Sequence, residues 1–233
     1  MKAKRYVALK EKVDKLLVNK FIRKSYYLSW LANPGIEANP KKIKALHEMQ
    51  SPTKLKHVQS LNGQVAALNR FISKSTDKCV LFFNILKGNK KFKWTEECKL
   101  DFQKLKEYMG RAPLLSKPQD REKLIVYLVV TQHAISAVLI REENKIQLPV
   151  YYVSKRLQDV ESRYPPMEKL AYCLIVASKK LRPHYQAYSI NVFTSYSLRQ
   201  ILQAPETSRR LLKWAIELAQ YDLEYKPRAA TKG

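Results

Sequence analysis

The stretch KLIVYLVVTQHAISAVLI, residues 123–140, decides the fold class of this chain. Two apolar runs of strand length flank the polar pair Gln132-His133, and a third run of the same kind covers residues 147–154. Short apolar runs that are bounded by polar turns are typical of buried strands. The stretch therefore predicts the start of a β-sheet that is built from consecutive strands.

The segments after these strands alternate between the helical and the strand period. Strands followed by a helix, a strand, two helices and a last strand are the order of an α/β unit with a mixed sheet. We expect a long helix from about Pro165 to Tyr185, a strand at 189–195, helices at about 197–203 and 207–220, and a strand at 222–227. Trp214, Ile216 and Leu218 are expected to be core or packing residues.

The first half of the chain shows the helical period instead. Asn39-Pro40 is typical of an N-cap with proline in the first turn, and Thr95 is expected to cap another helix. Between them, apolar residues recur every three or four positions from Leu55 to Phe71. A lone glycine in that helix, Gly63, predicts close backbone packing or a kink.

The predicted fold class is α/β, or α+β over the whole chain. It begins with an N-terminal amphipathic helix at 5–24, continues with a compact helical bundle at 39–110, and ends in a mixed β-sheet that is flanked by helices. The boundary between bundle and sheet is expected near residues 111–121.

The charge balance of the chain favours a polyanionic partner. The 44 Lys and Arg residues outnumber the 20 Asp and Glu residues, which gives a formal net charge of +24. Such an excess suits phosphate contacts with nucleic acid, whereas solubility alone and a membrane surface are the alternatives. No apolar run reaches the roughly 18–20 residues that span a bilayer, and no secretory signal is visible. We expect a soluble intracellular protein without membrane contact, in the cytoplasm or the nucleus.

Cysteine and histidine usage predicts neither disulfides nor a metal site. Cys79, Cys98 and Cys173 are odd in number and widely spaced, and the four histidines form no close pair. This spacing fits neither a disulfide framework nor a zinc pattern. We therefore expect three reduced, buried thiols, no metal ligands and no cofactor.

Long segments of the chain are similar to a known family. GIEANPKKIKALHEMQSPTKLKHVQSLNGQVAALNRFIS, KFKWTEECKLDFQKLKEYM, PVYYVSKRLQDVESRYPPMEKLAYCLIVASKKLRPHYQ and SRRLLKWAIELAQYDLEYKPR resemble the Pol polyprotein of plant gypsy-type LTR retrotransposons. The resemblance implies a remnant of the reverse transcriptase N-terminal segment at 1–34, a thumb-like bundle at 35–112, and an RNase H-like domain at 113–233. It also implies that the RNase H-like domain is truncated at its C-terminal end.

The polymerase centre of the family has no counterpart in this sequence. Asn33 runs through Pro34 into Gly35, where the family has most of its fingers and palm, and neither Tyr-x-Asp-Asp nor adjacent aspartates occur. Two-metal catalysis needs fixed carboxylates around the metal pair. We therefore expect no DNA synthesis by this chain, and we interpret the join as a deletion or an over-spliced gene model.

The resemblance also locates the carboxylates that hold Mg²⁺ in active RNase H relatives. The first three positions match Val129, Leu170 and Ser195, and the fourth is expected beyond residue 233. Apolar side chains cannot replace the oxygen ligands of magnesium. Glu168 lies two positions from Leu170 and is expected to face away, because two residues turn a helix by about 200°. The sequence therefore predicts no catalytic residues.

Several polar residues are candidates for nucleic-acid contact, although each could equally belong to an ordinary solvated surface. Phe92 and Trp94 could stack on bases, but core anchoring is favoured. Polar side chains on one helix, which also include Gln64 and Asn69, could follow a minor groove by shape. The predicted contacts are Lys87, Lys90, Lys91, Lys93, Gln59, Asn62, Lys155, Arg156, Arg209 and Arg210. Arg209 and Arg210 could instead be a mobile exposed pair.

The function that the sequence favours is nucleic-acid binding without catalysis, with an RNA–DNA hybrid or duplex as partner. Other Pol chains are further candidate partners. An active RNase H or reverse transcriptase within a Pol polyprotein is the enzymatic alternative. A non-catalytic protein-interaction scaffold and a pseudogene product stay open.

Overall fold

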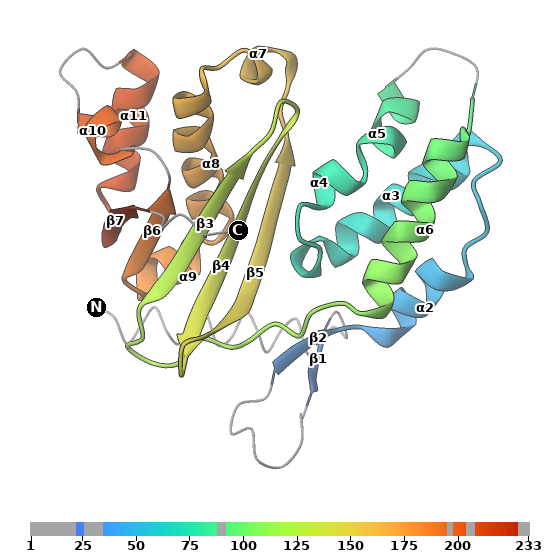
Figure 1. The fold of residues 1–233 in the computed structure, drawn as a ribbon, viewed down its shortest axis with the longest axis horizontal. Helices are drawn as coiled ribbons and strands as arrows, with labels where there is room; N and C mark the ends of the chain where they lie inside the picture. Colours follow the sequence, from blue (N-terminus) through green and yellow to red (C-terminus); the bar gives the residue numbers. More distant parts are fainter. Residues whose placement is uncertain (1–21, 26–34, 88–91, 195–197, 204–207, 228–233) are drawn as a thin grey trace.

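A computed structural model describes residues 22–25, 35–87, 92–194, 198–203 and 208–227. A group of helices lies beside a five-stranded sheet, and a second group of helices covers the other face of that sheet (Figure 1). The first group comprises α2 (Pro40–Glu48), α3 (Leu55–Leu68), the 3-10 turn η1 (Asn69–Phe71), α4 (Ser75–Lys78), α5 (Val80–Lys87) and α6 (Glu96–Gly110). We call this first group the bundle.

The sheet and its covering helices follow the order that the sequence predicts. The strands are β3 (Leu124–Val130), β4 (Ala134–Glu143), β5 (Ile146–Arg156), β6 (Ile190–Thr194) and β7 (Leu223–Pro227). The helices are α7 (Asp159–Ser162), α8 (Pro166–Lys180), α9 (Arg182–Ala187), α10 (Leu198–Gln203) and α11 (Arg209–Leu218). The predicted α/β class with a mixed sheet is thereby confirmed.

The sheet is mixed because its first three strands are antiparallel and its last two are parallel. The strand order is β5-β4-β3-β6-β7. β3 pairs antiparallel with β4 in a register that sets Val129 opposite Ser136, and it pairs parallel with β6. Leu124, Val126 and Leu128 point into a core that they share with α8. Strand alternation then places Val129 on the other face.

The predicted caps of the bundle helices are present. Asn39 Oδ1 accepts a hydrogen bond from the backbone N–H of Lys41 at 2.9 Å, at the start of α2. Thr95 Oγ1 accepts from the backbone N–H of Cys98 at 3.4 Å, at the start of α6. Each bond satisfies one of the donors that a helix leaves unpaired in its first turn.

Aromatic packing closes the core of the bundle. Trp94 stacks on Phe82, with ring centroids 5.5 Å apart, and meets the edge of Phe102 at 6.1 Å. Phe92 and Trp94 both pack against the bundle core. The expectation of core anchoring for these two residues is confirmed.

The prediction for Gly63 was wrong. α3 is continuous from Leu55 to Leu68, and a Cβ built on Gly63 would meet no heavy atom within 4 Å. The glycine therefore lies on the exposed side of the helix, where neither close packing nor a kink requires it.

The long helix expected from Pro165 to Tyr185 is in fact two helices. α8 ends at Lys180, and α9 begins at Arg182 with Pro183 in its first turn. Proline has no N–H to donate to the preceding turn, and its ring clashes with the carbonyl four residues earlier. The chain therefore breaks at Leu181.

The N-terminal prediction is mostly outside the described residues. Of the helix expected at 5–24, only the last residues are described, and they belong to the strand β1 (Ile22–Ser25). β1 pairs antiparallel with β2 (Gly35–Ala38), whose Ile36 also bridges to Leu115. These strands were not predicted, because four-residue segments carry too little periodicity.

The bundle packs on the sheet face opposite α8. The backbone N–H of Thr76 in α4 donates to Ser154 Oγ on β5 at 3.1 Å, and Ser154 Oγ lies 3.0 Å from Ser136 Oγ on β4. Tyr152, also on β5, packs against the bundle core, whereas Val153 packs into the core under α8. Tyr152 is therefore half-buried between the bundle and the sheet.

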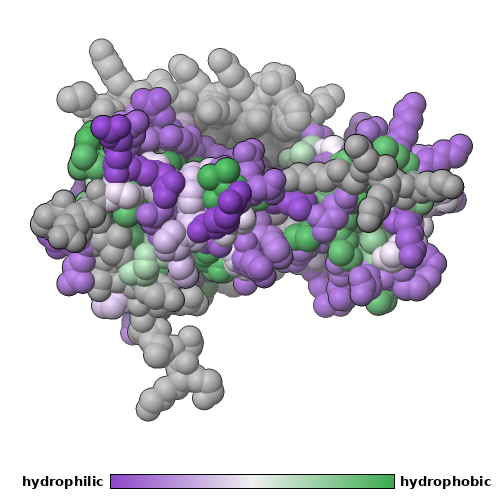
Figure 2. Space-filling model, turned by 90° about the horizontal axis from the view of Figure 1, so that it is seen from above, coloured by the Kyte–Doolittle hydropathy of each residue, from purple (hydrophilic) through white to green (hydrophobic). Residues whose placement is uncertain are grey.

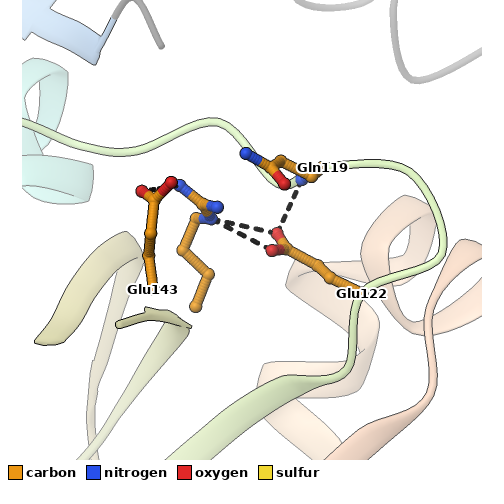
Figure 3. Close-up of polar contacts among 4 residues, drawn as sticks. Gln119, Glu122 and Glu143 are labelled. Atoms are coloured by element: carbon orange, nitrogen blue, oxygen red, sulfur yellow. Dashed lines mark hydrogen bonds and ion pairs between the residues drawn. The ribbon is translucent and has the colours of Figure 1, made fainter. Parts of the chain in front are cut away.

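A buried arginine fixes the segment that leads from α6 to the sheet. Arg141 on β4 donates to Glu122 and to Glu143, and the backbone N–H of Gln119 donates to Glu122 at 2.6 Å. Figure 3 shows Glu122 and Glu143 approaching from two sides. The end of the connection that precedes β3 is therefore tied to β4 through Glu122 and Arg141.

The remaining sequence expectations concern membranes and thiols. Among the described residues, no helix is both long and apolar enough to cross a membrane. Cys79, Cys98 and Cys173 are free and buried, as expected. Burial raises the pKa of Cys79 to about 12, and it does the same for Cys173.

Candidate nucleic-acid interface

The positions matched to catalytic carboxylates carry no acidic side chain. Val129 is half-buried on β3, and Leu170 on α8 is 7% exposed within the core between helix and sheet. Cys173, one helical turn after Leu170, donates its thiol to the backbone oxygen of Ser136 at 3.3 Å. Ser195 lies outside the described residues. Around Val129 and Leu170 the structure offers packing, not ligands.

These residues do not fit a magnesium ion. Magnesium prefers oxygen ligands in an octahedral arrangement. The side chains of Val129 and Leu170 contain no oxygen, and no group of three His, Cys, Asp or Glu side chains in the described ranges could hold a metal. Glu168, the nearest acid in sequence, accepts from Arg210 and lies 3.5 Å from Ser208 Oγ, so it is engaged with α11.

The structure brings together three of the predicted nucleic-acid contacts in one cavity. A space of about 330 Å³ opens between the bundle and β5, and its lining includes Asn62 from α3 together with Lys155 and Arg156 from β5. Phe83 and Leu86 from α5 and Ser75 from α4 also line it. We call this cavity the junction pocket.

Unpaired polar atoms distinguish the junction pocket. Arg156 Nη2 donates to Asn84 Oδ1 on α5 at 2.7 Å, but Arg156 Nη1 has no partner among the described residues. Within the same described ranges, neither atom of the Asn62 amide has a partner. A buried polar group left unsatisfied costs roughly 1–3 kcal/mol. A ligand that offers hydrogen bonds here would recover part of that cost.

Lys155 remains charged beside this pocket. Its Nζ donates to Glu161 Oε1 at 2.6 Å and lies 4.6 Å from the centroid of the Tyr172 ring. Burial lowers the pKa of Lys155, but hydrogen bonds to Glu161 and Tyr172 outweigh it, so the pKa is raised overall. The ammonium group is thus positive but already has an acidic partner.

Arg210 takes a packing role that its sequence context did not reveal. Its guanidinium lies 4.0 Å from the centroid of Tyr164 and pairs with Glu168. Trp214 stacks with Tyr172 at 5.4 Å beside it. Arg210 is half-buried, so its interpretation as one of a mobile exposed pair was wrong. Arg209 is exposed, as expected.

The other predicted contacts are spread over the surface. Gln59 on α3 and Lys93 before α6 are exposed, whereas the Lys87 side chain, Lys90 and Lys91 lie outside the described parts. Gln64 is half-buried, and Asn69 Oδ1 accepts from Ser75 Oγ. Seen from above, hydrophilic residues dominate both units, and hydrophobic ones form small separate patches (Figure 2). Lys93 and Gln59 are accessible to a ligand, and their role stays a prediction.

Sequence reasoning missed the residues that complete the pocket. Phe83 and Leu86 belong to the apolar run of α5, and nothing local marks them as neighbours of β5. Glu161, the acidic partner of Lys155, could have been found from the sequence, because it stands three residues after Gln158, the N-cap of α7. The spacing of a cap and its acid is a readable signal.

Comparison with known proteins agrees with this architecture. Residues 94–192 match the family described as the RNase H-like domain found in reverse transcriptase. The chain is similar to Pol polyproteins of LTR retrotransposons. The Pol polyprotein of transposon 297 from Drosophila melanogaster is 26% identical over 223 residues, which are 93% of this chain and 20% of that polyprotein. The Tf2-3 polyprotein of Schizosaccharomyces pombe is 23% identical, over 86% of this chain and 16% of its own length. This Pol-like chain thus spans about a fifth or less of these curated relatives.

Solved structures with the same fold come from a foamy virus. Its protease-reverse transcriptase in complex with an RNA/DNA hybrid matches 97% of this chain and 33% of its own, with a TM-score of 0.70 and 17% identity. The form in complex with double-stranded DNA matches with the same TM-score and 16% identity, over 100% of this chain and 44% of its own. The fold of this chain is therefore similar to that of the matching part of the foamy viral protease-reverse transcriptase.

Proposed function

We propose that this chain is a nucleic-acid-binding part of a Pol polyprotein that holds an RNA–DNA hybrid or duplex without cutting or extending it. The junction pocket carries the proposal, because it joins Asn62 of the bundle to Lys155 and Arg156 of the sheet. The net charge of +24 supports it, since phosphate contacts release counterions. The foamy viral neighbours were solved with a hybrid and with duplex DNA.

Loss of catalysis is the second half of the proposal. The resemblance to Pol polyproteins matches Val129, Leu170 and Ser195 to positions where active relatives hold magnesium with carboxylates, and none of the three is acidic. The sequence also contains no Tyr-x-Asp-Asp for nucleotide addition. Both reactions depend on metal-bound oxygens that orient and activate the attacking group. We infer a role similar to a connection domain, which binds the hybrid and leaves the chemistry to other domains.

Origin and assembly complete the proposal. The segments that resemble plant gypsy-type elements support an origin in such an element. An intact Pol chain is then a natural partner. Co-expression with an intact Pol chain from a related element, followed by affinity purification, tests this association. The purification uses nuclease and 0.5 M salt, at which the screening length is about 4 Å, so that nucleic acid does not bridge the two chains. Failure to co-purify would contradict it.

A salt-dependent titration tests nucleic-acid binding. Fluorescence anisotropy of a labelled RNA–DNA hybrid is measured with the full chain at roughly 50 and 200 mM salt. We expect saturable binding that weakens steeply with salt, because several phosphates are neutralised. Absence of binding at the lower salt concentration would overturn the proposed function.

A cleavage assay tests the loss of catalysis separately. The hybrid is incubated with the chain and Mg²⁺, and a preparation carrying Arg156→Gln is used as a matched control for contaminating nuclease. We expect no cleavage beyond that of the buffer. Cleavage that EDTA abolishes and that co-purifies with the folded chain would show an active enzyme instead.

A further inference from the structure

We propose that the junction pocket binds one unpaired nucleotide of the nucleic acid that the chain holds. This inference rests on the proposed function and specifies the ligand of its central site. A cavity of about 330 Å³ lies at the lower end of the size range of small-molecule sites. It is suited to a single base with its sugar and not to a stacked base pair.

The apolar side of the pocket suits the face of a base. Phe83 is half-buried on α5 and lines the cavity together with Leu86 and Val65. The aromatic group that closes the bundle core consists of Phe82, Trp94 and Phe102. Phe83, the next residue on α5, makes no ring contact with this group. Aromatic side chains that line a nucleic-acid site stack on exposed bases irrespective of sequence.

The polar side of the pocket suits the edge of the base and a phosphate. The Asn62 amide offers one acceptor and two donors, and within the described residues none of them is used. An asparagine amide forms paired hydrogen bonds with adenine, which makes adenine the favoured base. Arg156 Nη1, also without a partner in the described part of the chain, adds a charged donor for the phosphate.

The location explains why the nucleotide must be unpaired. The pocket is walled by α3 and α5 on the bundle side and by β5 on the sheet side. A base within a duplex is stacked on both faces and cannot enter such a space. Proteins read unpaired bases by stacking and by hydrogen bonds to their edges. A bulge, an overhang or a nicked end would supply such a base.

Three hybrids that differ at one position test the inference. The full chain is titrated by anisotropy with a fully paired hybrid, the same hybrid with one bulged adenosine, and the same hybrid with an abasic bulge. We expect the adenosine bulge to bind roughly tenfold more tightly than the paired hybrid, which is within the range for stacking of one base. The abasic bulge, which has equal flexibility but no base, should bind like the paired hybrid.

Variants locate the effect in the pocket. Phe83→Ala should abolish the preference for the bulge and retain most of the affinity for the paired hybrid, and Asn62→Leu should also abolish the preference. Lys213→Gln removes an exposed charge on α11, across the sheet from the pocket, and should leave the preference unchanged. Circular dichroism verifies folding, and Arg156→Gln substitutes for any variant that does not fold.

The outcomes separate this inference from the proposed function. Equal binding of all three hybrids would overturn the nucleotide pocket while leaving hybrid binding intact. A bulge preference that survives Phe83→Ala, Asn62→Leu and Arg156→Gln would place the unpaired base elsewhere and also overturn it. No binding of any hybrid would instead refute the proposed function.

Discussion

Arg141 donates through Nε to both carboxylate oxygens of Glu122, at 3.2 and 3.1 Å, although its side chain is only 2% exposed. Its Nη1 donates to Glu143 at 2.9 Å. A buried guanidinium is tolerated only when its charge and its donors are both satisfied. The three residues therefore form a charged group that fastens the segment before β3 to the sheet.

Truncation of Arg141 should be among the most destabilising single changes in this chain. Arg141→Ala leaves two carboxylates without their partner, and we expect a loss of about 3–5 kcal/mol in the free energy of unfolding. Arg141→Met keeps the volume of the stem and should cost less. Urea unfolding of both variants measures the difference. Equal stability of Arg141→Ala and the parent would show that the group contributes nothing.

Gly63→Ala should stabilise α3. The new methyl group meets no atom within 4 Å, and alanine exceeds glycine in helix propensity by about 1 kcal/mol. We expect a gain of that order in chemical unfolding. A loss of stability would mean that the exposed backbone at Gly63 is needed in the folded chain.

Hybrid affinity of the same Gly63→Ala variant tests the face of α3 that carries Gln59. If that face touches the nucleic acid, the methyl group should weaken binding although the protein is more stable. Unchanged affinity would remove this face of α3 from the interface.

The Glu161 carboxylate should make stability depend on pH at the acid end. Burial raises the pKa of Glu161, but hydrogen bonds from Lys155, Tyr172 and the backbone of Gln158 outweigh burial and lower it below 4.5. The stabilisation is therefore complete above the unfolded value of 4.5 and is lost as pH falls through the lower folded value.

Comparison with Glu161→Gln isolates this contribution. The parent should be the more stable protein at pH 7, and the difference should shrink as pH falls below 4.5. Lys155 has a raised pKa, so its share is complete below 10.5 and is lost only as pH rises through the folded value. A stability difference that is independent of pH would contradict the coupling.

Arg209 and Arg210 should behave differently when each is changed to glutamine. Arg210→Gln removes the contact with Tyr164 and leaves Glu168 without its cation, so we expect about 1 kcal/mol or more of lost stability. Arg209→Gln changes an exposed side chain and should alter stability by less than about 0.5 kcal/mol. If Arg209 contacts a phosphate, its loss should reduce the salt slope of hybrid binding by about 1. Equal losses of stability in the two variants would refute the assignment of Arg210 as a packing residue and of Arg209 as a solvent-exposed one.

The buried thiols should be inert in the folded chain. Burial raises the pKa of Cys79 and of Cys173 to about 12, so little of either thiol is the reactive thiolate at neutral pH. A colorimetric thiol reagent should react slowly with native protein and should titrate all three cysteines in guanidinium. Rapid reaction of the native chain would show that the cores open easily.

The sequence predicted the central strands well because their apolar runs are bounded by polar turns. β3, β4 and β5 agree with the expected ranges, and so do the caps at Asn39 and Thr95. Errors arose where tertiary context decides. Ile216 has the spacing of a core residue on α11 and is nevertheless 67% exposed.

The candidate site was only partly predictable. Its polar and charged members, Asn62, Lys155 and Arg156, were recognised as candidates by residue type. Phe83 and Leu86 were not, because an apolar helix gives no sign of which neighbour it will meet. Arg210 was misjudged because its partners Tyr164 and Glu168 lie more than forty residues away in sequence.

The sequence by itself determined the excess of positive charge, the order of helices and strands, and the side chains at Val129, Leu170 and Ser195. These properties are local, since charge, periodicity and residue identity can be read position by position. Only the tertiary structure decided that Asn62 and Arg156 line one pocket, and that Arg141 is buried between two acids. Such pairings depend on how the bundle packs on the sheet, and this packing is the sum of many distant contacts that no short pattern contains.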